Sequence, residues 1–142
     1  MPCEFPVINE SNESVAQIFK TIKTIAVVGL SPDPEKDSHK VAKYLQEKGY
    51  TIFPVYPKEE TILGQKVYRS LSEIPEAVDM VDMFRKPEVA DGLVDEAIKR
   101  GDVKVVWLQK GIVNNAALEK AKAAGMQTVQ NKCAMVEHRV NA

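Results

Sequence analysis

One segment, residues 24–45 with the sequence TIAVVGLSPDPEKDSHKVAKYL, constrains the fold of this chain more than any other. Its apolar run, residues 25–28, is continuous rather than alternating, which is typical of a parallel strand that is covered on both faces. Gly29 follows where the backbone turns, and Val41 and Leu45 then lie one helical turn apart. The segment therefore predicts a strand, a tight turn and a helix whose first amides can bind an anion such as a phosphate.

The same alternation of apolar runs and amphipathic stretches continues along the chain. Apolar runs predict further strands at 50–55, 78–84, 103–108 and 127–129, with a short strand remnant at 67–68 inside an irregular loop. Amphipathic spacing and capping residues predict helices at 15–22, from Pro87 to Gly101, and from Asn114 or Asn115 to Ala124. Before the first of these helices, the polar run from Ser11 to Ser14 offers hydroxyl or amide caps. In the helix after Pro87, the residues expected to face the core are Val89, Leu93, Ala97 and Ile98.

Strands that alternate with helices at this spacing indicate a mainly parallel sheet joined by right-handed crossovers. We therefore predict an α/β fold that is Rossmann-like and doubly wound, with a five-stranded sheet and helices on both faces. The length of 142 residues suits one domain over 1–142, with the helical segment 1–23 packing on the sheet. In such sheets, ligands bind outside the carboxyl ends of the strands, near the point where the strand order reverses.

The composition is that of an ordinary globular protein, and it narrows the range of partners. The net charge is −1, so no overall field attracts nucleic acid or an acidic membrane surface. No segment approaches membrane-spanning length and the first residues lack an export pattern, so we expect a cytoplasmic protein. The two cysteines, Cys3 and Cys133, show no CxxC spacing, and we expect no disulfide between them.

Basic residues follow the predicted strands, at the end where a ligand is expected. These residues are Lys36, Lys58, Arg85, Lys86, Lys110 and Lys132. If they gather on one rim of a nearly neutral protein, they favour a small polyanionic ligand. The alternative is ordinary surface chemistry, because 19 of the 142 residues are Lys or Arg and loops collect them.

The absence of two nucleotide-binding motifs limits which nucleotide the chain is expected to bind. The dinucleotide fingerprint requires GxGxxG in the first turn and an acidic residue about 20 residues further on. The turn here has the single glycine Gly29, and Lys58 stands where the acidic residue is expected. A lysine at that place favours an adenosine with an extra ribose phosphate, as in coenzyme A or NADP, over NAD. The chain also lacks GxxxxGK[ST], which argues against a triphosphate-hydrolysing site.

Five motifs, in this order and at this spacing, resemble those of the small single-domain coenzyme A-binding proteins. The motifs are VVGLSPDPEKDSHKVAKYL, IFPVYPKEETILGQKVYRSLSEIP, VDMVDMFRKPE, VVWLQKGIVN and NKCAMVEHR. This family is related to the coenzyme A-binding domain of the succinyl-CoA synthetase alpha subunit. The resemblance covers nearly the whole chain, with one departure: the family usually has Asn before the proline that ends the second strand, where this chain has Tyr56.

The resemblance implies a coenzyme A site at the carboxyl ends of the strands. It places the coenzyme phosphates at the first turn and the helix start, at Gly29, Ser31, Lys36, Ser38 and His39. It places Lys58 near the nucleotide end, Phe84 and Arg85 along the groove, and the pantetheine arm beside Gln109, Gly111 and Ile112. Serine and backbone amides suit phosphate, and Phe and Ile suit an apolar arm.

Two functions from different classes stay open. The first is a non-catalytic module that binds coenzyme A or an acyl-CoA and acts alone, as a homo-oligomer or with an enzyme partner. The second is a small oxidoreductase or transferase that uses NADP or an acyl-CoA in the same groove, with His39 or Cys133 as the reactive residue. The first is favoured, because the related synthetase depends on a phosphorylated histidine in a separate domain and on a partner subunit. The 142 residues contain neither that domain nor that subunit.

Other candidate groups have simpler explanations. Cys133, Glu137 and His138 lie close in the sequence, but zinc requires three or four ligands, so we expect no metal site. Cys133 is either a small buried hydrophobe or, if it faces the groove, a partner for the coenzyme thiol in a mixed disulfide. His39, in the first turn of a helix, is either an ordinary exposed helix residue or, with its charged form disfavoured by the helix dipole, a neutral donor of a hydrogen bond to a phosphate. Trp107 is expected in the core or at an oligomer contact.

Overall fold

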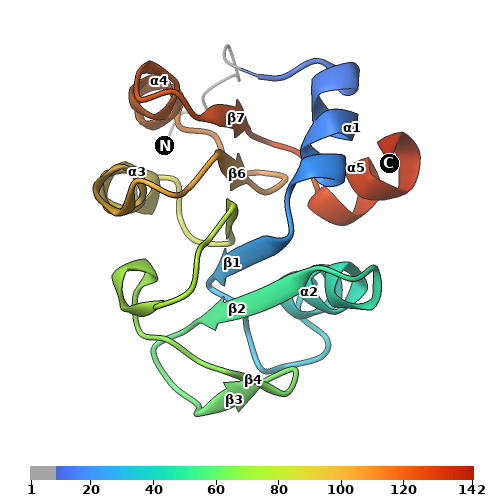
Figure 1. The fold of residues 1–142 in the computed structure, drawn as a ribbon. Coiled ribbons are helices and arrows are strands. Elements are labelled where there is room, and N and C mark those ends of the chain that lie inside the picture. The colour runs from blue at the N-terminus through green and yellow to red at the C-terminus, as the bar shows by residue number, and fades with distance from the viewer. Residues whose placement is uncertain (1–8) are drawn as a thin grey trace.

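Five parallel strands form the central sheet of the computed structural model, which describes residues 9–142 (Figure 1). The strands are β1 (Thr24–Val28), β2 (Thr51–Val55), β5 (Met80–Met83), β6 (Val105–Leu108) and β7 (Gln127–Val129). Their order in the sheet is β2-β1-β5-β6-β7, and every neighbouring pair is parallel. The predicted α/β, Rossmann-like fold with a five-stranded sheet is confirmed. Three of the strands, β2, β5 and β6, are shorter than predicted.

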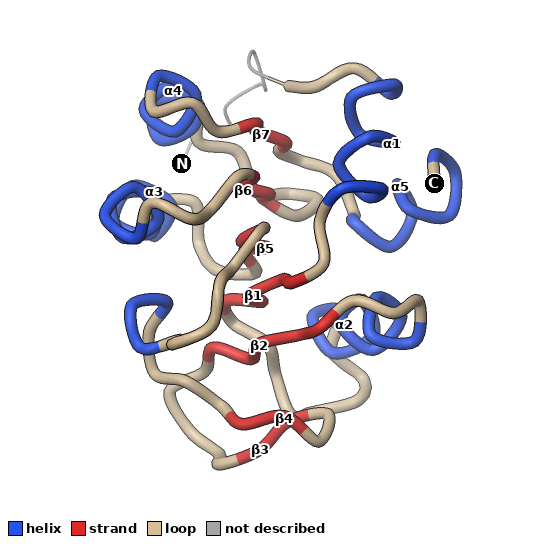
Figure 2. Tube along the Cα trace, viewed as in Figure 1, coloured by secondary structure: helices blue, strands red, loops and turns tan. Residues whose placement is uncertain are grey.

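Helices cover both faces of this sheet (Figure 2). On one face lie α1 (Asn12–Thr21), α2 (Asp37–Glu47) and α5 (Ala134–Asn141); on the other lie α3 (Val89–Arg100) and α4 (Asn115–Ala123). The strands are buried on both sides, which explains their continuous apolar runs. Trp107 is fully buried against α1, with its ring centroid 5.5 Å from that of Phe19. The core alternative for Trp107 is therefore confirmed.

Local capping signals act as the sequence predicts. The Ser11 hydroxyl accepts a hydrogen bond from the Ser14 amide at the start of α1, and the Asn114 side chain accepts one from the Ala117 amide at the start of α4. Gly101 ends α3 in the left-handed conformation, with a φ of 81°. Among residues 9–142, no helix is long and apolar enough to cross a membrane.

The crossover between β2 and β5 differs most from the prediction. It contains a hairpin of β3 (Thr61–Ile62) and β4 (Gln65–Lys66), followed by the 3-10 turn η1 (Leu71–Glu73). The hairpin turn has positive φ at both Leu63 and Gly64. Leucine rarely adopts that conformation, so the sequence carried little signal for this turn. The predicted strand remnant is present as one parallel bridge between Tyr68 and Val55.

Two details of the predicted helices are wrong. Pro87 does not begin α3, because it lies in a preceding turn in which the Val89 amide bonds to the Lys86 carbonyl. Ile98 does not face the core, because 37% of its surface is exposed beside the buried stripe of α3. The sequence analysis also missed α5. This helix packs on the sheet, but Ala134 is its one buried side chain. So short a buried stripe leaves almost no periodic signal.

Candidate functional site

The carboxyl ends of the five parallel strands meet at one edge of the sheet. From β1 the chain continues through α2 to β2 on one side, whereas β5 lies on the other side of β1. The strand order therefore reverses beside β1, and the loop after β1 faces the crevice that this reversal opens. All of the candidate residues lie in the loops at this edge or in the first turn of α2 behind them.

Gly29 holds the first loop close to the end of β5. Its amide donates a hydrogen bond to the Val55 carbonyl over 2.9 Å, and its φ is 89°. A β-carbon at this place would lie 2.8 Å from the Phe84 carbonyl oxygen and 3.0 Å from the Arg85 side chain. Only glycine therefore allows the turn to contact Phe84 and Arg85, two of the other candidate residues.

Three candidate residues bind one another and fix the loop to α2. The Ser31 amide donates to the Ser38 hydroxyl over 3.0 Å, and the His39 Nδ1 lies 2.9 Å from the Ser31 carbonyl oxygen. The Ser31 hydroxyl accepts a hydrogen bond from the Asp33 amide. Lys36 caps α2 through its backbone only, and its side chain is exposed. The His39 amide bonds to the Lys36 carbonyl, whereas the Asp37 and Ser38 amides before it have no acceptor inside the helix and suit an anion at this place.

The contact of His39 changes how it can act. A carbonyl oxygen only accepts, so the His39 Nδ1 carries the hydrogen in this bond. In a neutral ring the other nitrogen, Nε2, then accepts rather than donates. His39 can therefore donate to a phosphate through Nε2 only as an imidazolium, and not in the neutral form that the sequence suggested.

A hollow at this edge, which we call the apolar groove, lies between α2, α5 and the ends of β5 and β6. Its volume is about 330 Å³. It is lined by Asp37, Lys40, Val41, Phe84, Gln109, Lys110, Ile112, Cys133, Met135 and Val136. Three candidate residues, Phe84, Gln109 and Ile112, thus share one groove, and Cys133 faces it as well. Gly111 lies beside it, with its amide bonded to the Asn131 side chain over 2.8 Å.

The second hollow, which we call the arginine hollow, lies at the ends of β1 and β2 against α3. Its volume is about 290 Å³. It is lined by Val28, Val55, Arg69, Ser70, Leu71, Arg85, Val89, Gly92, Leu93 and Glu96. Arg85 was a candidate, whereas Arg69 was missed because nothing in the sequence places residue 69 beside the end of β2.

A buried acid lies behind the apolar groove. Asp82 of β5 is completely buried, and its Oδ1 accepts a hydrogen bond from the Gln109 Nε2 over 2.6 Å. Gln109 in turn accepts from the Ala134 amide at the start of α5 over 3.3 Å. The Asp82 Oδ2 has no partner within residues 9–142. Burial raises the pKa of Asp82 to about 7, and the hydrogen bond from Gln109 opposes that rise.

Asp82 was also missed, although its sequence signal is visible. It is the one charged residue of β5, whose sequence is MVDM. A charge in a strand that is covered on both faces requires a buried partner, and here the partner is Gln109. The side chain of Gln109 is therefore committed to a structural role as well as lining the groove.

The basic residues share the predicted edge but not one hollow. Lys110 lines the apolar groove and Arg85 lines the arginine hollow. Lys36, Lys58, Lys86 and Lys132 follow strands at the same edge without lining either hollow. No ion pair within the described part of the chain neutralises any of the six. These cations thus flank the hollows rather than filling one.

His138, another reactive candidate, lines neither hollow. The His138 Nδ1 is 2.9 Å from the Tyr44 hydroxyl, and its ring packs edge-on against Phe19, Tyr44 and Tyr50. Burial, together with nearby Lys48, lowers the pKa of His138. Over residues 9–142 no group of three His, Cys, Asp or Glu side chains is placed to hold a metal. Cys133 is a free, half-buried thiol, and Cys3 lies outside the described residues.

This arrangement defines a Rossmann-like domain with a candidate ligand site at the strand-order reversal. Residues 23–139 match the CoA binding domain family, and the chain belongs to it.

Three relatives illustrate the family. The uncharacterized protein YneT of Bacillus subtilis is 39% identical over 132 residues, which is 93% of this chain and 97% of that protein. A hypothetical protein from Pyrococcus horikoshii has a solved structure with a TM-score of 0.90 and 42% identity over 99% of both chains. The alpha subunit of an ADP-forming acetate–CoA ligase from Pyrococcus furiosus is 30% identical over 82% of this chain. The match spans only 26% of that subunit.

Proposed function

We propose that this protein is a cytoplasmic, non-catalytic module that binds coenzyme A or an acyl-CoA across the carboxyl edge of its sheet. The observation that carries the proposal is the pair of hollows on either side of the Gly29 turn, one apolar and one lined by two arginines. Coenzyme A has the matching three parts: an apolar pantetheine arm, a pyrophosphate and an adenosine with a ribose phosphate.

Each part has a suitable place at the edge. The pantetheine arm suits the apolar groove, with Phe84 and Ile112 as apolar walls and Gln109 and Gly111 at its border. The pyrophosphate suits the loop from Gly29 to the first amides of α2, with Lys36 exposed beside it. The adenosine suits the arginine hollow, and Lys58, in the loop after β2, is the cation we assign to the ribose phosphate.

The non-catalytic part of the proposal rests on what the shared region includes. The chain corresponds to about a quarter of the ligase subunit that it resembles, so the ligase activity is not carried over. A binding module of this kind would sense, buffer or deliver the coenzyme to an enzyme partner or a second copy. The alternative is a small oxidoreductase or transferase that uses NADP or an acyl-CoA, and it draws support from Cys133 facing the groove.

Isothermal titration calorimetry separates these functions. The protein is titrated with coenzyme A, dephospho-coenzyme A, NAD and NADP under one set of conditions. We expect binding of coenzyme A, with a clear loss of affinity when the ribose phosphate is removed. Binding of the nicotinamide cofactors alone would reject the proposal and favour the alternative.

Replacing Lys58 with alanine should weaken coenzyme A about tenfold and dephospho-coenzyme A much less, because a charge-assisted contact to one phosphate contributes about 1.5 kcal/mol. The measurement is the dissociation constant of each ligand. The matched control is Lys122→Ala, which removes the same charge from the exposed end of α4 at the opposite edge of the sheet. Equal losses for the two ligands would remove Lys58 from the ribose phosphate.

Coenzyme A should protect Cys133 from alkylation, because the thiol lines the groove that we assign to the pantetheine arm. The measurement is the rate of iodoacetamide modification in a Cys3→Ser background, with and without saturating ligand. We expect a decrease of about tenfold or more, as for a site that is mostly occupied. Adenosine 3′,5′-bisphosphate, which lacks the arm, is the control and should protect far less. Equal protection by both compounds would place the arm elsewhere.

A further inference from the structure

Arg69 is the cation at this edge that the sequence analysis missed, and its contacts reach the loop that carries Lys58. We propose that Arg69 is a positioning residue that fixes the backbone of Lys58 and so determines the preference of the site for an adenosine with a ribose phosphate. This inference rests on the proposed function, and it assigns the specificity of that site to a residue outside the strand ends.

The contacts of Arg69 are made by one nitrogen. Its Nη1 donates to the Tyr56 carbonyl over 3.0 Å and to the Lys58 carbonyl over 2.9 Å. These two carbonyls flank Pro57 at the point where the chain leaves β2. A single charged donor that binds both carbonyls holds the backbone on either side of the proline in one conformation.

The position of Arg69 is itself fixed by its neighbour. The Tyr68 amide donates to the Pro54 carbonyl over 2.9 Å, and the Tyr56 amide donates to the Tyr68 carbonyl over 3.0 Å. Tyr68 is therefore paired to the end of β2 as a short parallel bridge with Val55. The guanidinium of Arg69 extends from a segment that is held against the sheet, so it is a firm support for the loop beside it.

The loop needs such a support because it does not belong to the sheet. Glu59, directly after Lys58, has a φ of 69°, a conformation that non-glycine residues seldom adopt. The side chains of Lys58 and Glu59 are exposed, so packing does little to fix the loop. A lysine on a mobile loop loses more conformational freedom when it binds a phosphate than one whose backbone is already held.

Arg69 also has hydrogen-bond donors that these contacts do not use. Within residues 9–142, its Nε and Nη2 make no hydrogen bond with another residue, and the side chain lines the arginine hollow with Arg85. It could therefore act through its charge alone, as a direct partner of the ligand. A direct contact with the ligand and positioning through Lys58 predict different results for Arg69→Lys and for the double variant Lys58→Ala/Arg69→Ala.

The test is the ratio of the dissociation constants of dephospho-coenzyme A and coenzyme A, measured by calorimetry for the wild type and for Arg69→Ala, Arg69→Lys and Lys58→Ala/Arg69→Ala. We expect both single variants to reduce the ratio about fivefold, because lysine keeps the charge but its shorter, differently shaped side chain does not place a donor where the Arg69 Nη1 reaches both carbonyls. We expect the double variant to match Lys58→Ala alone, because a residue that acts through Lys58 has no effect once Lys58 is absent.

The control is Lys66→Ala, which removes a charge from β4, close to Arg69 in the sequence. The Lys66 ammonium lies over the Tyr68 ring and binds no carbonyl of the loop that carries Lys58. This variant should keep the wild-type ratio, and thermal unfolding of each variant checks that the fold is intact. A wild-type ratio for Arg69→Lys, or additive losses in the double variant, would overturn the inference and leave the proposed function standing. A wild-type protein that does not distinguish the two ligands would overturn both.

Discussion

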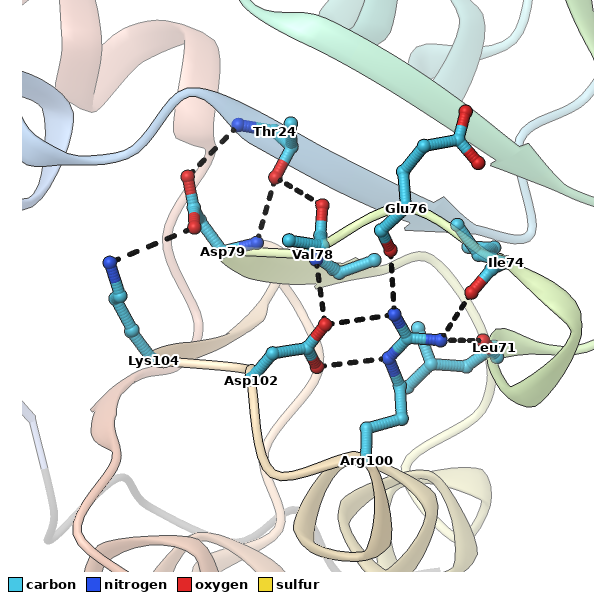
Figure 3. A network of polar contacts seen from close by, with 10 residues as sticks. Thr24, Leu71, Ile74, Glu76, Val78, Asp79, Arg100, Asp102 and Lys104 are labelled. Carbon is cyan, nitrogen blue, oxygen red and sulfur yellow. Dashed lines mark hydrogen bonds and ion pairs between the residues drawn. The ribbon is translucent and has the colours of Figure 1, made fainter.

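Replacing Arg100 with alanine should lower the free energy of unfolding by about 3 kcal/mol, although Arg100 lies far from the candidate ligand site. Figure 3 shows its guanidinium enclosed by carbonyl and carboxylate oxygens. The side chain is only 12% exposed. It donates to the carbonyls of Leu71, Ile74 and Glu76 and makes two hydrogen bonds to Asp102.

The effect is large because one side chain holds the irregular crossover against α3. Three carbonyls of that segment would lose their charged donor together, and Asp102 would lose its ion pair. Burial alone would raise the pKa of Asp102, but the hydrogen bonds from Arg100 and from the Val78 amide outweigh it and lower the pKa. The carboxylate therefore stays charged, and it becomes costly when its cation is removed.

Urea denaturation of the wild type and three variants checks this expectation. Arg100→Lys keeps one charge but cannot reach all five acceptors, so its loss should be about half as large. Lys99→Ala removes the neighbouring exposed lysine, and it should change the stability by less than about 0.5 kcal/mol. A loss below about 1 kcal/mol for Arg100→Ala would show that solvent replaces these bonds at little cost.

The sequence predicted those parts of the fold that depend on periodicity. The continuous apolar run 25–28 and the caps at Ser11 and Asn114 each depend on residues close in the chain. Their physics is local, so the sequence shows it directly. The strand ends follow from the same pattern, which is why the loops at the site were found.

The parts that the sequence did not predict depend on contacts between distant residues. Arg69 binds carbonyls 11 and 13 residues away, and Gln109 bonds to Asp82 across 27 residues of chain. No local spacing encodes such pairs, because the tertiary fold brings them together. The basic rim shows the same limit: its residues share an edge, but which of them line a hollow depends on side-chain packing.

Asp82→Asn should stabilise the protein relative to the wild type, and by about 3 kcal/mol more at pH 8 than at pH 5. The folded protein keeps a proton on Asp82 up to about pH 7, whereas the unfolded chain releases it near its ordinary pKa of 3.8. The folded state thus binds more protons between these values, and the stability falls as the pH rises through this window. For this one group, the loss between pH 5 and pH 8 is about 3 kcal/mol.

Asparagine suits this test because it keeps the shape of the side chain and the oxygen that accepts from Gln109, without the buried charge. The measurement is the difference in free energy of unfolding between the variant and the wild type, from urea denaturation at both pH values. Taking this difference cancels His138, whose lowered pKa makes the stability fall in the opposite direction, toward acid. Glu119→Gln, which neutralises an exposed carboxylate on α4, should show the same difference at both pH values. If Asp82→Asn also shows a constant difference, Asp82 is charged in the folded protein throughout this range, and a water or an ion reaches its Oδ2.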